Sequence, residues 1–119
     1  MYTQKLRLDG RVAVVTGGAR NIGLACVTAL AEFGARVIIA DRDAELAARA
    51  VTELTAQGLD VSATALDGTD TTQGDACATR IGAEEGHVDI LVCSAGLCIS
   101  EVRAEDMTDG QWLKQMDIN

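Results

Sequence analysis

The amino-acid sequence predicts an α/β fold: a doubly wound parallel sheet, of which this chain supplies the first four strands and their flanking helices. Three observations support this prediction. Apolar runs of strand length alternate with segments of helical periodicity. The first and fourth runs are continuously apolar, as expected of strands that helices cover on both faces. A glycine-rich segment joins the first run to the first helical segment.

The predicted strands cover residues 11–16, 35–41, 60–67 and 88–96, each bounded by Gly, Asp or Ser. Two helical segments separate the first three strands, and each has one apolar face that we expect to be buried. In the first segment this face consists of Ile22, Cys26, Ala29, Leu30 and Phe33. In the second it consists of Leu46, Ala47, Ala50, Val51 and Leu54. Gly34 and Gly58 stand where the helix ends need a residue that adopts positive φ.

Two further helices are expected. Residues 71–85 predict a helix that its glycine and threonine content weakens, by up to about 1 kcal/mol per glycine. A last helix should begin near Thr108 and run to the end of the printed sequence, so that the chain ends within this element. In that case the fourth strand would be an exposed edge of the sheet.

Composition excludes several functional classes. The 119 residues form one expected domain, with a formal charge of −8 and a pI near 4.4, which argues against nucleic-acid or anionic-membrane partners. No signal-like or membrane-length apolar run is present, so we expect a cytoplasmic protein. No Cys-x-x-Cys pair occurs and His87 completes no zinc spacing, so no metal site is expected. The cysteines other than Cys93 are interpreted as small buried hydrophobic residues, and Cys98 is the only one expected near a substrate cleft.

The glycine-rich segment, Thr16 to Gly23 ("TGGARNIG"), is the strongest functional signal. A turn from a buried strand into a helix presents unpaired backbone N–H groups and the positive end of the helix dipole, which together bind anions. Glycines allow the backbone to approach a pyrophosphate, and Gly23 allows the helix to lie close to the strand. The pattern predicts dinucleotide binding; the alternative is a tight connection with no ligand.

Asp41 supports the dinucleotide interpretation. It ends the second predicted strand, 18 positions after Gly23, near the spacing of a carboxylate that accepts the ribose hydroxyls. A 2′-phosphate would meet negative charge there, so NAD is favoured over NADP. Arg20 and Arg42 lie close in sequence and would offset part of this repulsion.

The segment Thr16 to Gly23 resembles the Thr-Gly-x-x-x-Gly-x-Gly pattern of the short-chain dehydrogenase/reductase family, with Asn21 in place of the middle glycine. Asparagine tolerates the left-handed conformation better than most residues. The resemblance continues through Asp67, "DILVCSAG" (89–96) and the segment from Trp112 to Asn119, and so covers essentially the whole chain. It implies a Rossmann-like fold, and within the family the chain looks most like polyol and secondary-alcohol dehydrogenases.

The resemblance also implies roles for individual residues. On the pyrophosphate side stand Gly17, Arg20, Asn21, Ile22 and Gly23, and Asp41 would bind the adenosine ribose. The adenine would lie beside Asp67 and Gly68, the latter in place of the family's usual aliphatic residue. The nicotinamide ribose would lie beside Ser94, Ala95 and Gly96; Cys93 and Ser94 replace two asparagines of the family pattern.

Only one of the family's catalytic residues has a counterpart in this sequence. Asn119 corresponds to the asparagine that supports a proton-relay water. The family also uses a serine and a tyrosine with a lysine four positions on, but Tyr2 is the sole tyrosine and Leu6 lies four positions beyond it. General acid–base catalysis, typically worth about 10²–10⁴-fold, is therefore absent from these residues. We expect this stretch alone to be inactive.

Three hypotheses follow. The chain is the cofactor-binding part of an NAD-dependent oxidoreductase that acts on a polyol or another secondary alcohol or ketone, and the resemblance implies a homo-oligomer, a dimer or tetramer, at full length. Alternatively, it is a non-catalytic module that binds a dinucleotide. A third hypothesis is an interaction protein that binds no nucleotide, which predicts no thermal stabilisation by NAD.

Overall fold

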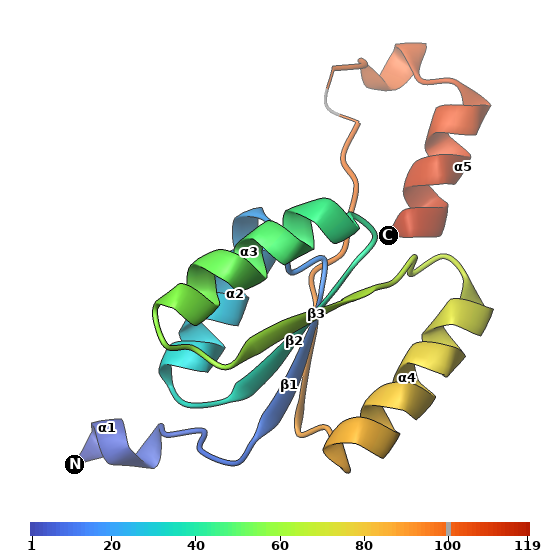
Figure 1. The fold of residues 1–119 in the computed structure, drawn as a ribbon. Coiled ribbons are helices and arrows are strands. Elements are labelled where there is room, and N and C mark those ends of the chain that lie inside the picture. Colours follow the sequence, from blue (N-terminus) through green and yellow to red (C-terminus); the bar gives the residue numbers. More distant parts are fainter. Residues whose placement is uncertain (100) are drawn as a thin grey trace.

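The computed structural model describes residues 1–99 and 101–119, and within them a four-stranded parallel sheet forms the centre of the fold (Figure 1). Its spatial order is β3-β2-β1-β4, and every neighbouring pair is parallel. The predicted α/β class with a parallel sheet is therefore confirmed. The strands are β1 (Val12–Thr16), β2 (Arg36–Asp41), β3 (Val61–Ala65) and β4 (Ile90–Cys93).

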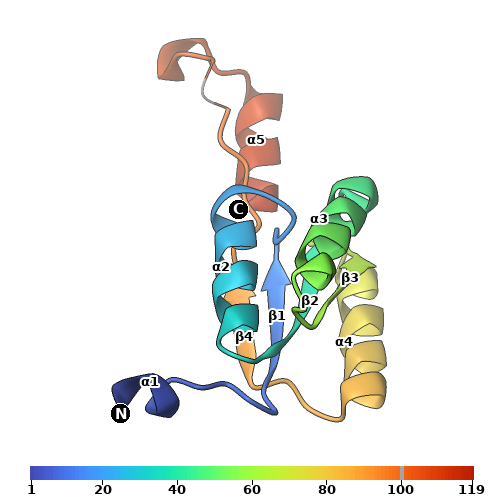
Figure 2. The same cartoon turned by 60° about the vertical axis from the view of Figure 1, so that its left-hand side comes forward.

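Helices lie on both faces of the sheet. Figure 2 shows α2 (Asn21–Glu32) and α3 (Ala44–Ala56) on one face and α4 (Thr71–Glu85) on the other. The last helix, α5 (Asp109–Ile118), lies beyond the carboxyl ends of the strands. The short helices α1 (Tyr2–Lys5) and η1 (Ala104–Asp106) have no counterpart among the predicted elements.

Alternating side chains of β1 and β2 supply the two halves of the core. On the α2 and α3 face, Val15 lies opposite Ile39 in the sheet, and both are fully buried. On the α4 face, Val14 lies opposite Ile38, and both belong to a cluster completed by Cys77 and other residues. The strands β1 and β2 are thus covered on both faces, as the continuous apolar run of β1 predicts.

The predicted buried face of α2 is wrong by about one residue position. The buried residues are Gly23, Val27 and Ala31, whereas Ile22 is 76% exposed. Nearly every residue of this helix is small or apolar, so hydrophobic periodicity does not define its orientation. Close contact defines it instead, because a Cβ at position 23 would overlap the carbonyl oxygen of Gly17. The predicted face of α3 is confirmed, with Ala47, Ala50 and Leu54 buried.

The prediction that β4 is covered on both faces is also wrong for this chain. The strand is an edge of the sheet, as expected, and its residues alternate between half-buried and exposed. Leu91, which lies opposite Val14 on the α4 face, is 63% exposed. A continuous apolar run shows only that a strand can be buried on both faces. In this chain only one face of β4 has a helix against it.

The predicted helix boundaries agree well with the structure. Gly34 and Gly58 have φ values of 101° and 81°, which confirms their role at helix ends. The weakened helix is α4, which begins after Asp70, whose carboxylate accepts hydrogen bonds from the first turn. The last helix begins after Thr108, whose side chain forms a capping box with Gln111.

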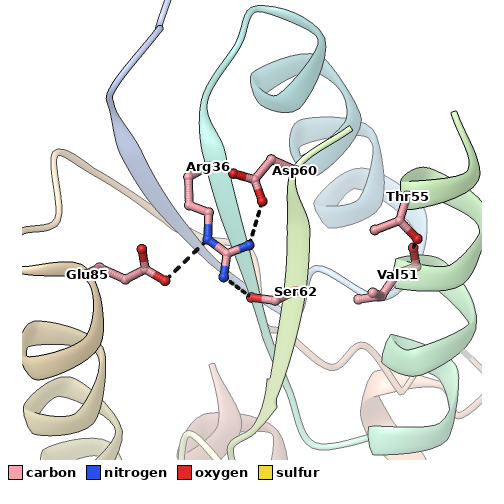
Figure 3. A network of polar contacts seen from close by, with 6 residues as sticks. All are labelled: Arg36, Val51, Thr55, Asp60, Ser62 and Glu85. Carbon is pink, nitrogen blue, oxygen red and sulfur yellow. Dashed lines mark hydrogen bonds and ion pairs between the residues drawn. The ribbon is translucent and has the colours of Figure 1, made fainter. Parts of the chain in front are cut away.

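At the amino edge of the sheet, Arg36 is the centre of a network of hydrogen bonds and ion pairs (Figure 3). From the first position of β2, Arg36 donates hydrogen bonds to Asp60 at 2.7 Å, to Ser62 at 3.1 Å and to Glu85 at 3.2 Å. One side chain therefore joins β2, the start of β3 and the end of α4. Since these groups are partly exposed, the network orients α4 and adds only modest stability. No helix in residues 1–99 and 101–119 is long and apolar enough to span a membrane.

Candidate functional site

A cleft of about 330 Å³ lies at the carboxyl edge of the sheet, where all four strands end. This is the edge at which open α/β sheets bind ligands. All eleven predicted cofactor-binding residues line the cleft: Gly17, Arg20, Asn21, Ile22, Gly23, Asp41, Asp67, Gly68, Ser94, Ala95 and Gly96. Eight further residues line it: Thr16, Ala40, Arg42, Leu66, Thr69, Leu97, Lys114 and Ile118.

The glycine-rich turn has the backbone geometry that its sequence predicts. Gly17 has φ 63° and Asn21 has φ 50°, so asparagine does occupy the left-handed region where a glycine is more usual. A Cβ at Gly17 would lie 2.7 Å from Ala95 Cα, and one at Gly18 would lie 3.0 Å from the carbonyl oxygen of Val15. The glycine-rich segment therefore packs closely against β1 and against the segment after β4, and leads directly into α2.

Asp41 connects two walls of the cleft. It is only 7% exposed. One carboxylate oxygen accepts the Ala19 N–H of the glycine-rich turn at 3.1 Å, and the other accepts the Asp43 N–H at 2.9 Å. Each oxygen retains a second lone pair that can accept a ribose hydroxyl. The side chain thus positions the turn and can also bind a sugar.

Asp67, with Gly68 and Thr69, forms the wall of the cleft that follows β3. The Thr69 hydroxyl donates to the Asp67 carboxylate at 2.7 Å, and the Thr69 N–H donates to the same oxygen at 3.0 Å. The hydroxyl bond first, and then the N–H bond, lower the pKa of Asp67 below its usual value. Asp67 is therefore held as a carboxylate beside the cleft.

The segment after β4 forms another wall of the cleft, in addition to the glycine-rich turn, the end of β2 and the segment after β3. The strand ends earlier than predicted, at Cys93. Beyond it, the Ser94 N–H lies 3.2 Å from both the carbonyl oxygen and the hydroxyl of Thr16, and the Ala95 N–H donates to the same hydroxyl at 3.4 Å. Thr16 ends β1 and therefore couples the glycine-rich turn to this segment. Ser94 and Ala95 come to the cleft through this contact.

Asn119 contacts this wall through its side chain. Its Oδ1 accepts the Leu97 N–H at 2.7 Å, and its Nδ2 donates to the Leu97 carbonyl oxygen at 2.7 Å. Both polar atoms of the amide are therefore used to hold the backbone. Unlike the eleven predicted cofactor-binding residues, Asn119 itself is not among the residues that line the cleft.

Three cations line the cleft without an ion-pair partner among the described residues: Arg20, Arg42 and Lys114. Sequence reasoning placed Arg20 in the site and Arg42 near it, but it missed Lys114, which comes from α5, 73 positions after Asp41. In a chain of net charge −8, this local positive charge suits a phosphate-bearing ligand.

The cysteines form no metal site within the described part of the chain, where no cluster of three or more His, Cys, Asp or Glu side chains occurs. Cys77 is buried and Cys26 half-buried, as expected of small hydrophobic residues. Cys93 is exposed, on the face of β4 that has no helix against it. Cys98 is also exposed, which corrects the expectation that it is buried, because it lies outside the sheet in the segment after β4; it does not line the cleft.

Comparison with known protein families identifies the family of this chain. The model of the short chain dehydrogenase family matches residues 11–119. The chain belongs to the short-chain dehydrogenase family. The predicted resemblance is therefore confirmed, and the glycine-rich turn, Asp41 and the segment after β4 occupy the matched region.

Relatives of this short-chain dehydrogenase chain include sugar-alcohol enzymes. It is 46% identical over 118 residues to galactitol 2-dehydrogenase of Rhizobium johnstonii, covering 99% of this chain and 46% of that protein. It matches the crystal structure of gox2181 with a TM-score of 0.93 and 64% identity, over 99% of this chain and 46% of that one. A metagenomic short-chain oxidoreductase in complex with NADP matches with a TM-score of 0.85 and 33% identity, over 93% and 50%. The chain thus spans about half the length of the curated relatives it matches.

Proposed function

We propose that this chain forms the NAD-binding part of a short-chain dehydrogenase that interconverts a polyol, or another secondary alcohol, and its ketone. One observation carries the proposal: the fold brings eleven residues from four separate segments of the chain into one cleft at the carboxyl edge of the sheet. A glycine-rich turn at a helix N-terminus and a buried carboxylate at the end of β2 are the two features a dinucleotide needs.

The side chains and backbone of the cleft fit a nicotinamide dinucleotide. A Cβ at Gly17 would collide with Ala95, so only glycine fits at this position of the turn. The turn leads into α2, whose first N–H groups lack intrahelical acceptors. These N–H groups and Arg20 would bind the pyrophosphate. Asp41 would accept hydrogen bonds from the adenosine ribose, and Asp67 with Gly68 would border the adenine. The bound cofactor supplies hydride transfer to or from the substrate carbon.

Preference for NAD over NADP rests on Asp41, whose buried carboxylate would lie beside a 2′-phosphate. Arg42 opposes this effect, because it lines the same cleft and forms no ion pair within 4 Å among the described residues. We expect the carboxylate to dominate, because it is fixed by two backbone hydrogen bonds.

Calorimetric titration of the chain with NAD⁺ and NADP⁺ tests this preference. We expect tighter binding of NAD⁺. Arg42→Ala should weaken NADP⁺ more than NAD⁺, while Arg49→Ala, on the outer side of α3 and remote from the cleft, should change neither. Tighter binding of NADP⁺ by the unmodified chain would refute the NAD assignment, and no binding of either would refute the proposed function.

The substrate class is proposed from the similarity to galactitol 2-dehydrogenase. A second candidate, a non-catalytic dinucleotide-binding module, is favoured by one observation: Tyr2 has Leu6, not lysine, four positions beyond it. The intact mass of the natural protein, followed by an assay of galactitol-dependent NAD⁺ reduction, separates the two. A mass of 12.4 kDa without activity supports the module, and a larger, active protein supports the dehydrogenase.

A further inference from the structure

Three side chains supply most of the hydrogen bonds to the backbone of the segment after β4. Ser94 and Ala95 bond to Thr16. Among the described residues, no backbone–backbone hydrogen bond reaches residues 96–99. Their partners come instead from α5 and from Asn119, the residue that caps it. The Leu97 N–H and carbonyl oxygen bond to the Asn119 amide, and the Ile99 N–H donates to Gln115 Oε1 at 3.0 Å.

The spacing of these contacts is regular. Gln115 and Asn119 are four positions apart, so they share one face of α5 and lie about 6 Å apart along its axis. Their partners are two positions apart, which corresponds to about 6.6 Å in an extended segment. The chain leaves the sheet along this segment and returns along α5 (Figures 1 and 2), so the later helix residue pairs with the earlier segment residue. The two amides therefore act as a short substitute for a neighbouring strand.

We propose that Gln115 is a positioning residue of the cofactor cleft, which with Asn119 fixes the segment 96–99 against α5. Gly96 and Leu97 line the cleft. The family resemblance implies that Gly96 lies beside the nicotinamide ribose, and the inference rests on the proposed dinucleotide-binding function. Gln115 is half-buried and is not among the residues that line the cleft, so it acts through the Ile99 backbone rather than by touching the ligand.

A general loss of stability is distinguishable from this role. No residue of α5 is buried, and the buried core clusters are formed by the sheet with α2, α3 and α4. Removal of one acceptor on α5 should therefore leave the global unfolding transition in place. Its effect should be confined to the segment 96–99 and to ligands long enough to reach it.

The test compares Gln115→Met, which keeps the side-chain length but has only a weak thioether acceptor, with Gln115→Glu, which keeps an oxygen acceptor. Gln4→Met, in α1 and remote from the cleft, is the matched control. Titration with NAD⁺ and with ADP gives the ratio of the two affinities. The added charge of Gln115→Glu acts on both phosphate ligands and so largely cancels in this ratio.

We expect Gln115→Met to weaken NAD⁺ about two- to ten-fold, the range that one neutral hydrogen bond contributes, with ADP binding unchanged. Gln115→Glu and Gln4→Met should keep the original ratio. An unchanged ratio in Gln115→Met, or an equal loss in Gln115→Glu, would overturn the inference.

Amide hydrogen exchange separates failure of this inference from failure of the proposed function. Gln115→Met should speed exchange of the Ile99 N–H about two- to ten-fold, while the Val15 N–H in β1 keeps its rate. If the unmodified chain binds no NAD⁺, the proposed function fails and the exchange result decides whether Gln115 holds the segment. Unchanged exchange at Ile99 would overturn the positioning role whatever the chain binds.

Discussion

Substitution of Gly17 by alanine tests the close packing of the cleft most sharply. Gly17 has φ 63°, and alanine in this region costs about 1–2 kcal/mol. Its new methyl group would also lie 2.7 Å from Ala95 Cα and 2.8 Å from Ala95 N, closer than real Cβ contacts. Relief of such an overlap costs about 1–3 kcal/mol. The free energy of unfolding should therefore fall by about 2–5 kcal/mol, a large fraction of the roughly 5–15 kcal/mol of a typical domain.

Gly10→Ala is the matched control, because Gly10 has φ 76° but nothing within 4 Å of the added methyl group. It should cost only about 1–2 kcal/mol, from the backbone alone. Urea unfolding followed by circular dichroism gives both values, and titration with NAD⁺ gives the effect on binding. Gly17→Ala should be the less stable variant and should bind NAD⁺ more weakly. Equal stability and equal NAD⁺ affinity of the two variants would refute the packing argument.

Three further substitutions test other elements. Gly82→Ala, inside α4 with nothing within 4 Å, should stabilise the chain by about 0.5–1 kcal/mol, and a lower urea midpoint would contradict this. The Val12 N–H donates to Asp89 and lowers the pKa of that carboxyl below its usual value. The ionised Asp89 carboxylate therefore stabilises the fold at pH values above its pKa in the unfolded chain, and this stabilisation is lost as pH falls through its pKa in the folded chain. Melting temperatures measured from pH 6 to about 3 should fall less steeply in Asp89→Asn than in the unmodified chain, and parallel curves would count against this. Thr108→Ala removes the α5 cap, worth about 1 kcal/mol, and should speed amide exchange within α5 without moving the global unfolding midpoint; a lower midpoint would show that α5 contributes to the core.

Local sequence signals predicted most of the fold. The apolar runs, the glycines at helix ends and the polar residue before α5 each act within a few positions, so their consequences can be derived without knowledge of the tertiary structure. The same holds for the glycine-rich turn, where the left-handed conformation of Asn21 follows from its place in the pattern. These signals also placed all the predicted cofactor residues along one cleft, because parallel strands end at a common edge.

The parts that escaped prediction depend on contacts between distant segments. The buried face of α2 follows from the approach of Gly23 to Gly17, which periodicity in a uniformly apolar helix does not reveal. The exposure of Leu91 depends on which elements cover an edge strand. Lys114 reaches the cleft because α5 folds back over the carboxyl edge of the sheet, and the amide contacts of Gln115 arise from the same reversal.

Titration of the isotope-labelled chain with NAD⁺, followed by backbone amide NMR, tests the central claim most directly. Saturable shift changes should concentrate in four segments from separate loops: residues 16–23, 41–42, 66–69 and 94–97. The outer side of α3, around Arg49, should remain unchanged. A chain that shows no saturable shifts, or shifts centred on α3, would contradict the assignment of the carboxyl-edge cleft as a dinucleotide site.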